Sequence, residues 1–221
     1  GERIPAAVET AKRFVMLAIK FGLNLGKGYG PVNTFAHLYR ESSRYRVLRD
    51  IEEARRLLEL NPKVSALVPE VGMNVAMAIP YAENTSDVAA VEGRIVKLSG
   101  GVKAVGCPKF GCSSHLARYI MEVIKHDSSR TAAVNLRNSD EILRLLKKRG
   151  LKVSFYDRRK EPDDVKRIEG MTIPWGVKQA IKRIGKVPDV IYHMGDVGKE
   201  PMIVILGENA SQLARTVTEV A

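Results

Sequence analysis

A glycine turn between two short β-forming runs places the strongest constraint on how this chain can fold. Ser99-Gly100-Gly101 separates residues 94–98 from residues 102–105, a pattern that predicts a β-hairpin. Elsewhere, runs of strand length alternate with runs of helical periodicity. A hairpin pairs its strands antiparallel, whereas a strand–helix–strand crossover pairs them parallel. The sequence therefore predicts an α/β fold with helices on both faces of a mixed sheet, and it disfavours a purely parallel sheet.

Periodicity also predicts the individual elements. Strict alternation of apolar residues over 71–79 predicts a strand in which Met73 and Met77 face the core, and helical spacing over 47–60 predicts a helix that ends at Asn61-Pro62. Further helices are expected over residues 8–22, 114–124, 139–149 and 210–220 and from about residue 174, and further strands over residues 131–136, 151–156, 189–192 and 202–206.

Composition limits the function classes. The formal net charge of +11 is compatible with nucleic acid, an anionic membrane or anionic small molecules as partners. The surplus is spread along the chain without a basic tail, aromatic residues make up only 6%, and no zinc-finger or RNA-binding motif is present, so nucleic-acid binding has no motif to support it. Two cysteines are too few for a disulfide framework or a tetrahedral zinc site. No apolar run has bilayer length and no signal peptide is recognisable, so we expect a soluble, cytoplasmic protein.

The strongest chemical pattern is the segment 106–115, where a glycine-containing turn leads into a helix. Either Ser113 or Ser114 is suited to cap that helix, and His115 falls in its first turn. Backbone N–H groups and the helix dipole make such an end an anion site, to which Lys109 adds charge. A histidine there can donate a proton or a hydrogen bond. An ordinary capped helix with an exposed histidine explains the pattern equally well.

A second glycine loop, residues 195–200, lies between two predicted strands. Gly195 and Gly198 allow close backbone approach to a phosphate and Lys199 adds charge, although the spacing is not that of a Walker A loop. A simple strand connection is the competing interpretation. Asp196, or Asp157 beside Arg158, could hold Mg²⁺ through water, but single acids are weak signals for a metal.

Other residues carry weaker signals. Asn74 interrupts an apolar strand, where burial demands a hydrogen-bond partner. Trp175 fits either stacking on a heterocycle or a place in the core. Three histidines, His37, His126 and His193, show no metal-ligand spacing and are interpreted as structural or surface residues.

Seven strings of the chain occur together, and in this order, in a known family. They are PEVGMN (69–74), VEGRIV (91–96), FGCSSH (110–115), AVNLR (133–137), DRRKEP (157–162), WGV (175–177) and GDVGKEPMI (195–203). The segment 47–221 thereby resembles the ThiN-type thiamine-phosphate synthase domain, which occurs mainly in archaea and some thermophilic bacteria. Cys112, where relatives often carry a small residue, is a mild departure.

The resemblance implies a fold, a reaction and a set of site residues. The fold would be a three-layer αβα sandwich with a mixed, largely antiparallel sheet, similar to class II aldolases. The reaction would condense hydroxymethylpyrimidine diphosphate with hydroxyethylthiazole phosphate, with Mg²⁺ on the diphosphate and no organic cofactor. Arg94 and His115 match the family's catalytic arginine and histidine. The expected substrate and phosphate contacts are Asn74, Lys109, Ser113, Ser114, Asn135, Arg137, Asp157, Arg158, Trp175, Gly195, Asp196, Gly198 and Lys199.

Residues 1–40 resemble a different protein, because a helix followed by Gly26-Lys27-Gly28-Tyr29-Gly30 is similar to the closing helix and tail of hydroxymethylpyrimidine phosphate kinases. We therefore expect the C-terminal part of a bifunctional enzyme without the kinase site. The main alternative is a non-catalytic thiamine-phosphate sensor, which is expected to lack Arg94 and His115, and a basic RNA-binding domain is a third option. A homodimer is the default expectation for oligomeric state.

Overall fold

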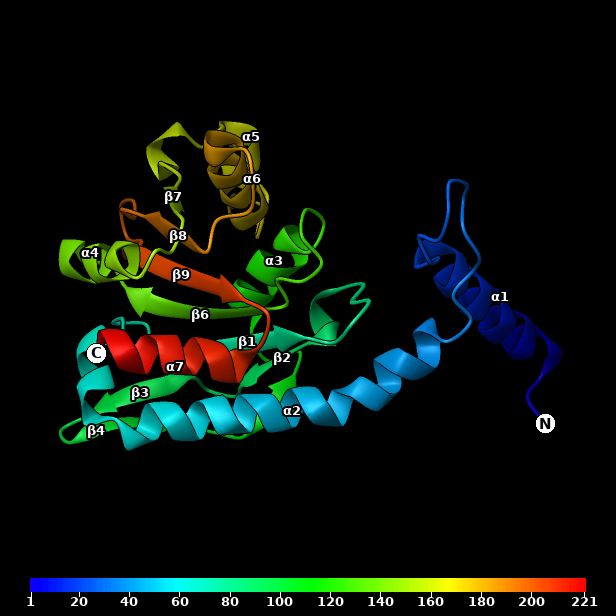
Figure 1. Ribbon diagram of the computed structural model, residues 1–221, viewed down its shortest axis with the longest axis horizontal. Coiled ribbons are helices and arrows are strands. Elements are labelled where there is room, and N and C mark those ends of the chain that lie inside the picture. The colour runs from blue at the N-terminus through cyan, green and yellow to red at the C-terminus, as the bar shows by residue number, and fades with distance from the viewer.

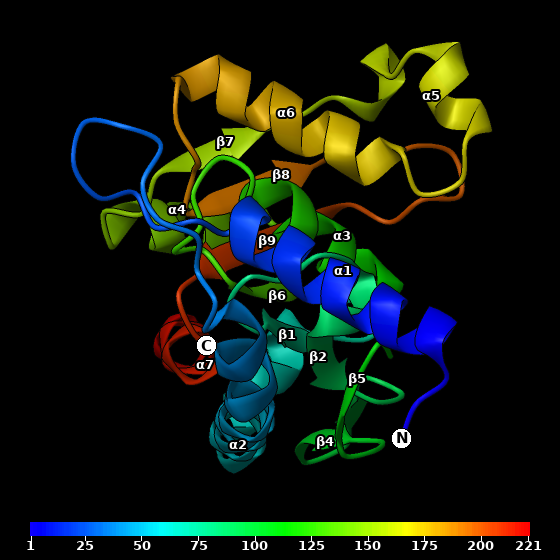
Figure 2. The same ribbon diagram turned by 90° about the vertical axis from the view of Figure 1, so that its right-hand side faces the viewer.

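A seven-stranded sheet in the order β5-β2-β1-β6-β9-β8-β7 forms the centre of the computed structural model, which describes residues 1–221 (Figures 1 and 2). Every neighbouring pair in it is antiparallel except β7 with β8. The strands are β1 (Val75–Ala78), β2 (Val88–Val91), β3 (Ile95–Leu98), β4 (Gly101–Ala104), β5 (Pro108–Phe110), β6 (Ala132–Arg137), β7 (Val153–Phe155), β8 (Val190–His193) and β9 (Met202–Gly207).

Helices cover the sheet in two layers. α2 and α7 pack on each other and on the central strands, and α3 and α6 pack on each other over the opposite face. The predicted three-layer sandwich with a mixed, largely antiparallel sheet is therefore confirmed. The helices are α1 (Ile4–Lys20), α2 (Ala36–Leu60), α3 (Ser114–Val123), α4 (Asp140–Lys148), α5 (Asp163–Arg167), α6 (Thr172–Ile184) and α7 (Ala210–Val220).

The predicted hairpin forms, but its strands β3 and β4 make a separate two-stranded sheet. The strand expected over residues 71–79 is wrong at its start, because Gly72 adopts φ +86° and Met73 makes only a single bridge to Ile95, so that β1 begins at Val75. Two strands were not expected at all. Every residue of β2 is buried, which removes the alternation that marks a half-exposed strand, and β5 has only three residues within the segment interpreted as a turn.

Helix α2 begins at Ala36, eleven residues before the predicted start. Its buried side chains continue at helical spacing through Ser43 and Arg40. The first turns of the helix, which the sequence did not predict, therefore have polar residues on their buried face. The Arg40 guanidinium donates to the Asp87 carboxylate at 2.9 Å, and the Asp87 side chain is only 3% exposed. A buried ion pair thus replaces the apolar stripe that periodicity detects.

Helix α1 lies apart from the sheet, and most of its large apolar side chains are exposed (Figure 1). It contacts the rest of the chain mainly at its C-terminal end, where Lys20 pairs with Glu83 at 3.0 Å and the Phe21 ring lies 4.9 Å from that of Tyr81. The hydrophobic core, by contrast, runs from Val47 to Val220 and falls within the unit predicted over residues 47–221. No helix combines the length and the apolar character that crossing a membrane requires.

A glycine within α6 makes room for the ring of Tyr156. A Cβ on Gly176 would lie 2.6–2.7 Å from three ring atoms of Tyr156. That ring is 2% exposed, and its hydroxyl is hydrogen-bonded to the Tyr119 hydroxyl at 2.8 Å. The ring therefore has little freedom to move aside.

Replacing Gly176 with Ala should lower the free energy of unfolding by about 1–3 kcal/mol, because the clash outweighs the usual gain of roughly 1 kcal/mol from Ala in a helix. Denaturant unfolding measures this change. In a Tyr156→Ala background the same substitution should be neutral or stabilising, so an equal loss in both backgrounds would contradict the steric explanation.

Candidate functional site

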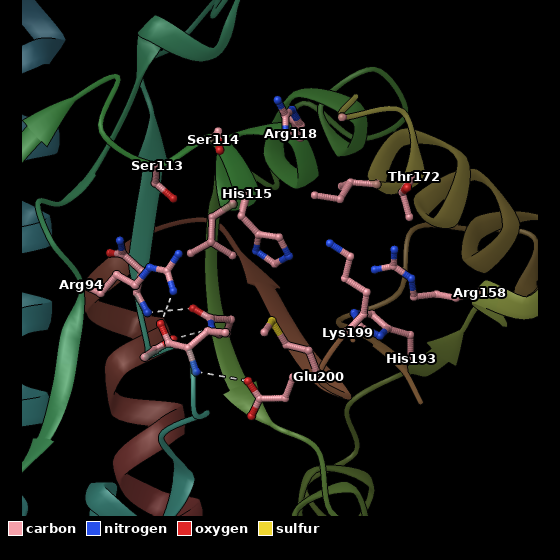
Figure 3. A pocket seen from close by; sticks show the side chains of 18 of the residues that line it. Arg94, Ser113, Ser114, His115, Arg118, Arg158, Thr172, His193, Lys199 and Glu200 are labelled. Atoms are coloured by element: carbon pink, nitrogen blue, oxygen red, sulfur yellow. Dashed lines mark hydrogen bonds between the residues drawn. The ribbon is translucent and has the colours of Figure 1, made fainter. Parts of the chain in front are cut away.

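A cavity of about 650 Å³ opens where loops leave the central strands and α3 begins (Figure 3). The predicted residues that line it are Asn74, Arg94, Ser113, Ser114, His115, Asn135, Arg158, Gly198 and Lys199. They come from segments that are far apart in the sequence. The fold therefore brings together most of the residues that the sequence singled out.

The backbone of Arg94 is unusual. It has φ +75° and follows Gly93 at +69°, and apart from Tyr81 it is the one non-glycine residue in the left-handed region. An arginine there is strained, and such strain persists only where the surroundings impose it. The guanidinium donates to the carbonyl of Val71 at the cavity wall, which leaves its other N–H groups free toward the cavity.

His115 lies in the first turn of α3, as predicted. Ser113 occupies the N-cap position but its side chain makes no capping hydrogen bond, and both Ser113 and Ser114 line the cavity. Burial, together with the positive charges of Arg94, Arg118 and Arg158, lowers the pKa of His115 to about 4. At neutral pH the imidazole is therefore uncharged and donates through one N–H.

His193, interpreted from the sequence as a structural or surface residue, lines the cavity with 3% of its surface exposed. The Gly195 N–H donates to its Nδ1 at 3.1 Å. An accepting Nδ1 carries no proton, so the proton of the neutral ring is on Nε2. Burial, together with Arg158 and His115, lowers its pKa to about 3. Its position before the predicted glycine loop was the only available signal.

The cavity holds more positive charge than the chain neutralises. Arg94, Arg118, Arg158 and Lys199 line it, and none of them forms an ion pair. The Nε of Arg158 is buried without any hydrogen-bond partner. Since buried polar groups are almost always paired, unpaired guanidinium groups facing a cavity indicate an anionic ligand.

The cavity has two carboxylates, Glu169 and Glu200. The Glu200 carboxylate accepts the backbone N–H groups of Glu70 and Val71 at 2.8 and 3.2 Å and so ties the β8–β9 loop to the loop before β1. No group of three or more His, Cys, Asp or Glu side chains is placed to hold a metal. Three residues of the cavity, Glu169, Glu200 and Arg118, are not among the predicted site residues. Glu200 lies in the predicted glycine loop, where only the glycines, Asp196 and Lys199 carried a chemical signal, whereas Glu169 and Arg118 lie in no recognisable motif.

Two buried asparagines shape the cavity floor. Asn74 Oδ1 accepts the Val91 N–H at 3.0 Å, and its Nδ2 donates to the Val91 carbonyl at 2.9 Å. Asn135 Oδ1 accepts the Asn74 N–H at 2.7 Å, and its Nδ2 donates to the Gly72 carbonyl at 3.1 Å. The expectation that Asn74 needs a hydrogen-bond partner is thus confirmed, and both side-chain amides form hydrogen bonds with backbone groups.

Other predicted site residues lie elsewhere. Lys109 pairs with Glu92 at 2.7 Å, Asp157 pairs with Arg159 at 3.0 Å, and the Trp175 ring packs edge-on to Tyr156 against the core. Arg137 and Asp196 line a second, adjoining cavity of about 930 Å³ that shares Gly198, Lys199 and Glu200 with the first.

The glycine loop differs from the expected phosphate cradle. The N–H groups of Asp196, Val197 and Lys199 donate within the loop, to the Lys199 carbonyl, Asp196 Oδ1 and the Asp196 carbonyl, and that of Gly195 donates to His193 Nδ1 at the end of β8. A Cβ on Gly195, at φ +78°, would lie 2.2 Å from the Lys199 carbonyl oxygen. The loop is a tight connection that presents the Lys199 side chain to the cavity.

The chain is thus an α/β sandwich whose cavity is lined by unpaired cations and two imidazoles. The profile of the family described as thiamine-phosphate synthase ThiN matches residues 50–219. The chain belongs to this thiamine-biosynthesis family.

Individual relatives agree. Thiamine-phosphate synthase ThiN of Methanothermobacter thermautotrophicus is 42% identical over 171 residues, which cover 76% of this chain and 90% of that protein. Bifunctional thiamine biosynthesis protein ThiDN of Methanocaldococcus jannaschii is 35% identical over 219 residues, 98% of this chain and 49% of that protein, so the chain spans about half of it. The solved structure of a C-terminal domain of phosphomethylpyrimidine kinase is 44% identical to this chain, with a TM-score of 0.75. The match covers 80% of this chain and 100% of that domain.

The two imidazoles should make stability depend on pH. Their pKa values in the fold, about 4 and about 3, lie below the ordinary value of 6.5, so between pH 6.5 and 5 the unfolded chain binds protons that the folded chain does not. The free energy of unfolding should therefore fall as pH falls through this range, by roughly 1.5 kcal/mol for each imidazole.

Urea unfolding at several pH values in a phosphate-free buffer checks this. The double variant His115→Gln/His193→Asn should show a flatter dependence between pH 6.5 and 5. An unchanged slope in that variant would mean that other groups cause the dependence.

Proposed function

We propose that this domain condenses hydroxymethylpyrimidine diphosphate with hydroxyethylthiazole phosphate to give thiamine phosphate and diphosphate. The observation that carries the proposal is the cavity itself, where four unpaired cations surround His115 in a chain of the ThiN family. Both substrates and the released diphosphate are polyanions, so the cavity matches their charge.

The reaction breaks one bond and forms one. The thiazole nitrogen supplies the electron pair for the new C–N bond to the pyrimidinylmethyl carbon, and the C–O bond to the diphosphate breaks with its electron pair leaving on oxygen. Negative charge therefore grows on the departing diphosphate. Arg94 is suited to contact two of its oxygens at once, and the His115 N–H to donate a hydrogen bond to a third.

The neutral state of His115 suits this role. A bound diphosphate offsets the charges of Arg94 and Arg118, which raises the pKa of the imidazole from its low starting point. His115 then donates a hydrogen bond to an oxygen that gains charge, which stabilises the transition state more than the bound substrate.

Mg²⁺ fits this cavity as an ion carried by the diphosphate. The chain offers no cluster of three metal-binding side chains, so the diphosphate oxygens would be its main ligands, with Glu169 the cavity carboxylate that no backbone group engages. The ion would neutralise charge on the leaving group. The cavity arginines bind the remaining phosphate oxygens.

We further propose that residues 1–40 are the end of a kinase domain in a bifunctional protein. The support is the match to the ThiDN protein over 98% of this chain, and the exposed apolar side chains of α1, which lies outside the core. Cytoplasmic location and a homodimer remain predictions.

Incubating the chain with both substrates and Mg²⁺ should produce thiamine phosphate. Arg94→Ala and His115→Ala should each lower kcat by at least about 10²-fold, the cost of removing one transition-state donor. Chromatographic detection of thiamine phosphate over time measures both rates.

Arg56→Ala and His37→Ala are matched controls, because both side chains are exposed on α2 outside the cavity. They should leave turnover unchanged. Near-normal turnover in either site variant would remove that residue from the mechanism. Tight binding of thiamine phosphate by a wild-type chain that never turns over would identify a sensor instead.

A further inference from the structure

Three of the four unpaired cations of the cavity fall into two sets at opposite ends, and the fourth, Arg118, lies on α3 with His115. Arg94 follows β2, next to one edge of the sheet, whereas Arg158 follows β7, the strand at the other edge. His193 ends β8, and Lys199 lies in the loop from β8 to β9. Figure 3 shows Arg158, Lys199 and His193 together on one side, Arg94 on the other, and His115 between them.

The charges that lower the pKa values of the two buried histidines agree with this separation. Positive charge from both ends, on Arg94 and on Arg158, lowers the pKa of His115. Of the arginines, only Arg158 contributes to the low pKa of His193. His193 thus belongs to the Arg158 end.

The Arg158 end is built to receive an anion. The Arg158 Nε is buried without a partner, and no acid pairs with Arg158 or Lys199. His193 is fixed from two directions, because the Asn138 side chain donates to its carbonyl at 2.9 Å and the Gly195 N–H donates to its Nδ1. The ring of Tyr156 lies 5.1 Å from the imidazole. The Nε2–H of His193 is therefore a preoriented donor beside two cations, Arg158 and Lys199.

We propose that Arg158, Lys199 and His193 bind the monophosphate of the thiazole substrate, while Arg94 and His115 hold the diphosphate of the pyrimidine substrate. The inference rests on the proposed function. The attacking nitrogen and the departing diphosphate must lie on different sides of the pyrimidinylmethyl carbon. Each substrate carries its own anion, so the reaction needs two phosphate sites facing each other across the cavity, and the two cationic ends supply them.

The first test separates the two substrates kinetically. Arg158→Ala and Lys199→Ala should each raise the KM for the thiazole monophosphate by roughly 10- to 100-fold, the scale of a lost charge-assisted hydrogen bond, and change the KM for the pyrimidine diphosphate by less than about 3-fold. With unphosphorylated hydroxyethylthiazole as acceptor, these variants and the wild type should have similar KM values. Arg159→Ala is the matched control, because its exposed side chain pairs with Asp157 outside the cavity, and both KM values should stay unchanged.

The second test separates ligand binding from structure at His193. His193→Asn keeps an acceptor near Nδ1 for the Gly195 N–H but removes the Nε2–H donor, so the KM for the thiazole monophosphate should rise about 10-fold. His193→Gln places an amide N–H near the position of Nε2 and should recover much of that loss. A purely structural role would make Gln the more damaging change, because it loses the bond to Gly195.

Three results would overturn the assignment: a rise confined to the KM for the pyrimidine diphosphate, an equal rise in both KM values, or no rise in either. Failure of the reaction itself gives a different signature, in which the wild type makes no thiamine phosphate. Calorimetric titration of the thiazole monophosphate alone onto the wild type and Arg158→Ala still tests the site in that case. Binding lost in the variant would support it, and equal binding would overturn it.

Discussion

The paired side-chain amides of Asn74 and Asn135 are the constraint on which the cavity depends. Asn74 lies just before β1, where regular pairing with β2 stops, and its amide takes the place of a backbone partner for both polar groups of Val91. Asn135, within β6, receives the Asn74 N–H and holds the Gly72 carbonyl. The strand ends can therefore separate without leaving buried backbone groups unpaired, a state that costs about 1–3 kcal/mol for each group. The loop of residues 69–74 that these amides hold also receives Arg94 and Glu200, so one polar junction positions both sides of the cavity.

The electrostatics of the cavity follow from this opening. A site with four unpaired cations and mostly buried imidazoles keeps both histidines neutral, because each added proton would meet both a desolvation penalty and like charge. An anion removes the like-charge part and gains direct contacts at the same time. The cavity is thus preorganised for negative charge, and the imidazoles serve as oriented N–H donors before any ligand arrives.

The sequence predicted those features whose physical signal is local. The glycine hairpin, the helix that begins at Ser114 and the position of His115 in its first turn all follow from residues adjacent in the chain. The failures have several physical causes. The first turns of α2 were missed because Arg40 fills a core position through its ion pair with Asp87, and the predicted strand over residues 71–79 was too long because alternation gave no sign that Gly72 turns the chain. His193 was interpreted as a structural or surface residue because the role of a histidine depends on the residues that the fold places beside it, which the sequence does not show.

The net charge of +11 illustrates the same difference between composition and structure. Many of the cations are neutralised locally, as where Arg55 lies between Glu52 and Glu59 on α2. Others, such as Lys147 and Lys148 in the last turn of α4, interact favourably with the negative end of the helix dipole. Such charges say little about function, because solvent and nearby acids satisfy them. The informative cations are those that are buried without an acidic partner. Arg158 is the clearest case, because its Nε is buried and donates to no acceptor in the chain. The unpaired state of a few arginines therefore indicates an anionic ligand. The net charge does not, because it would be the same for a protein whose cavity was neutral.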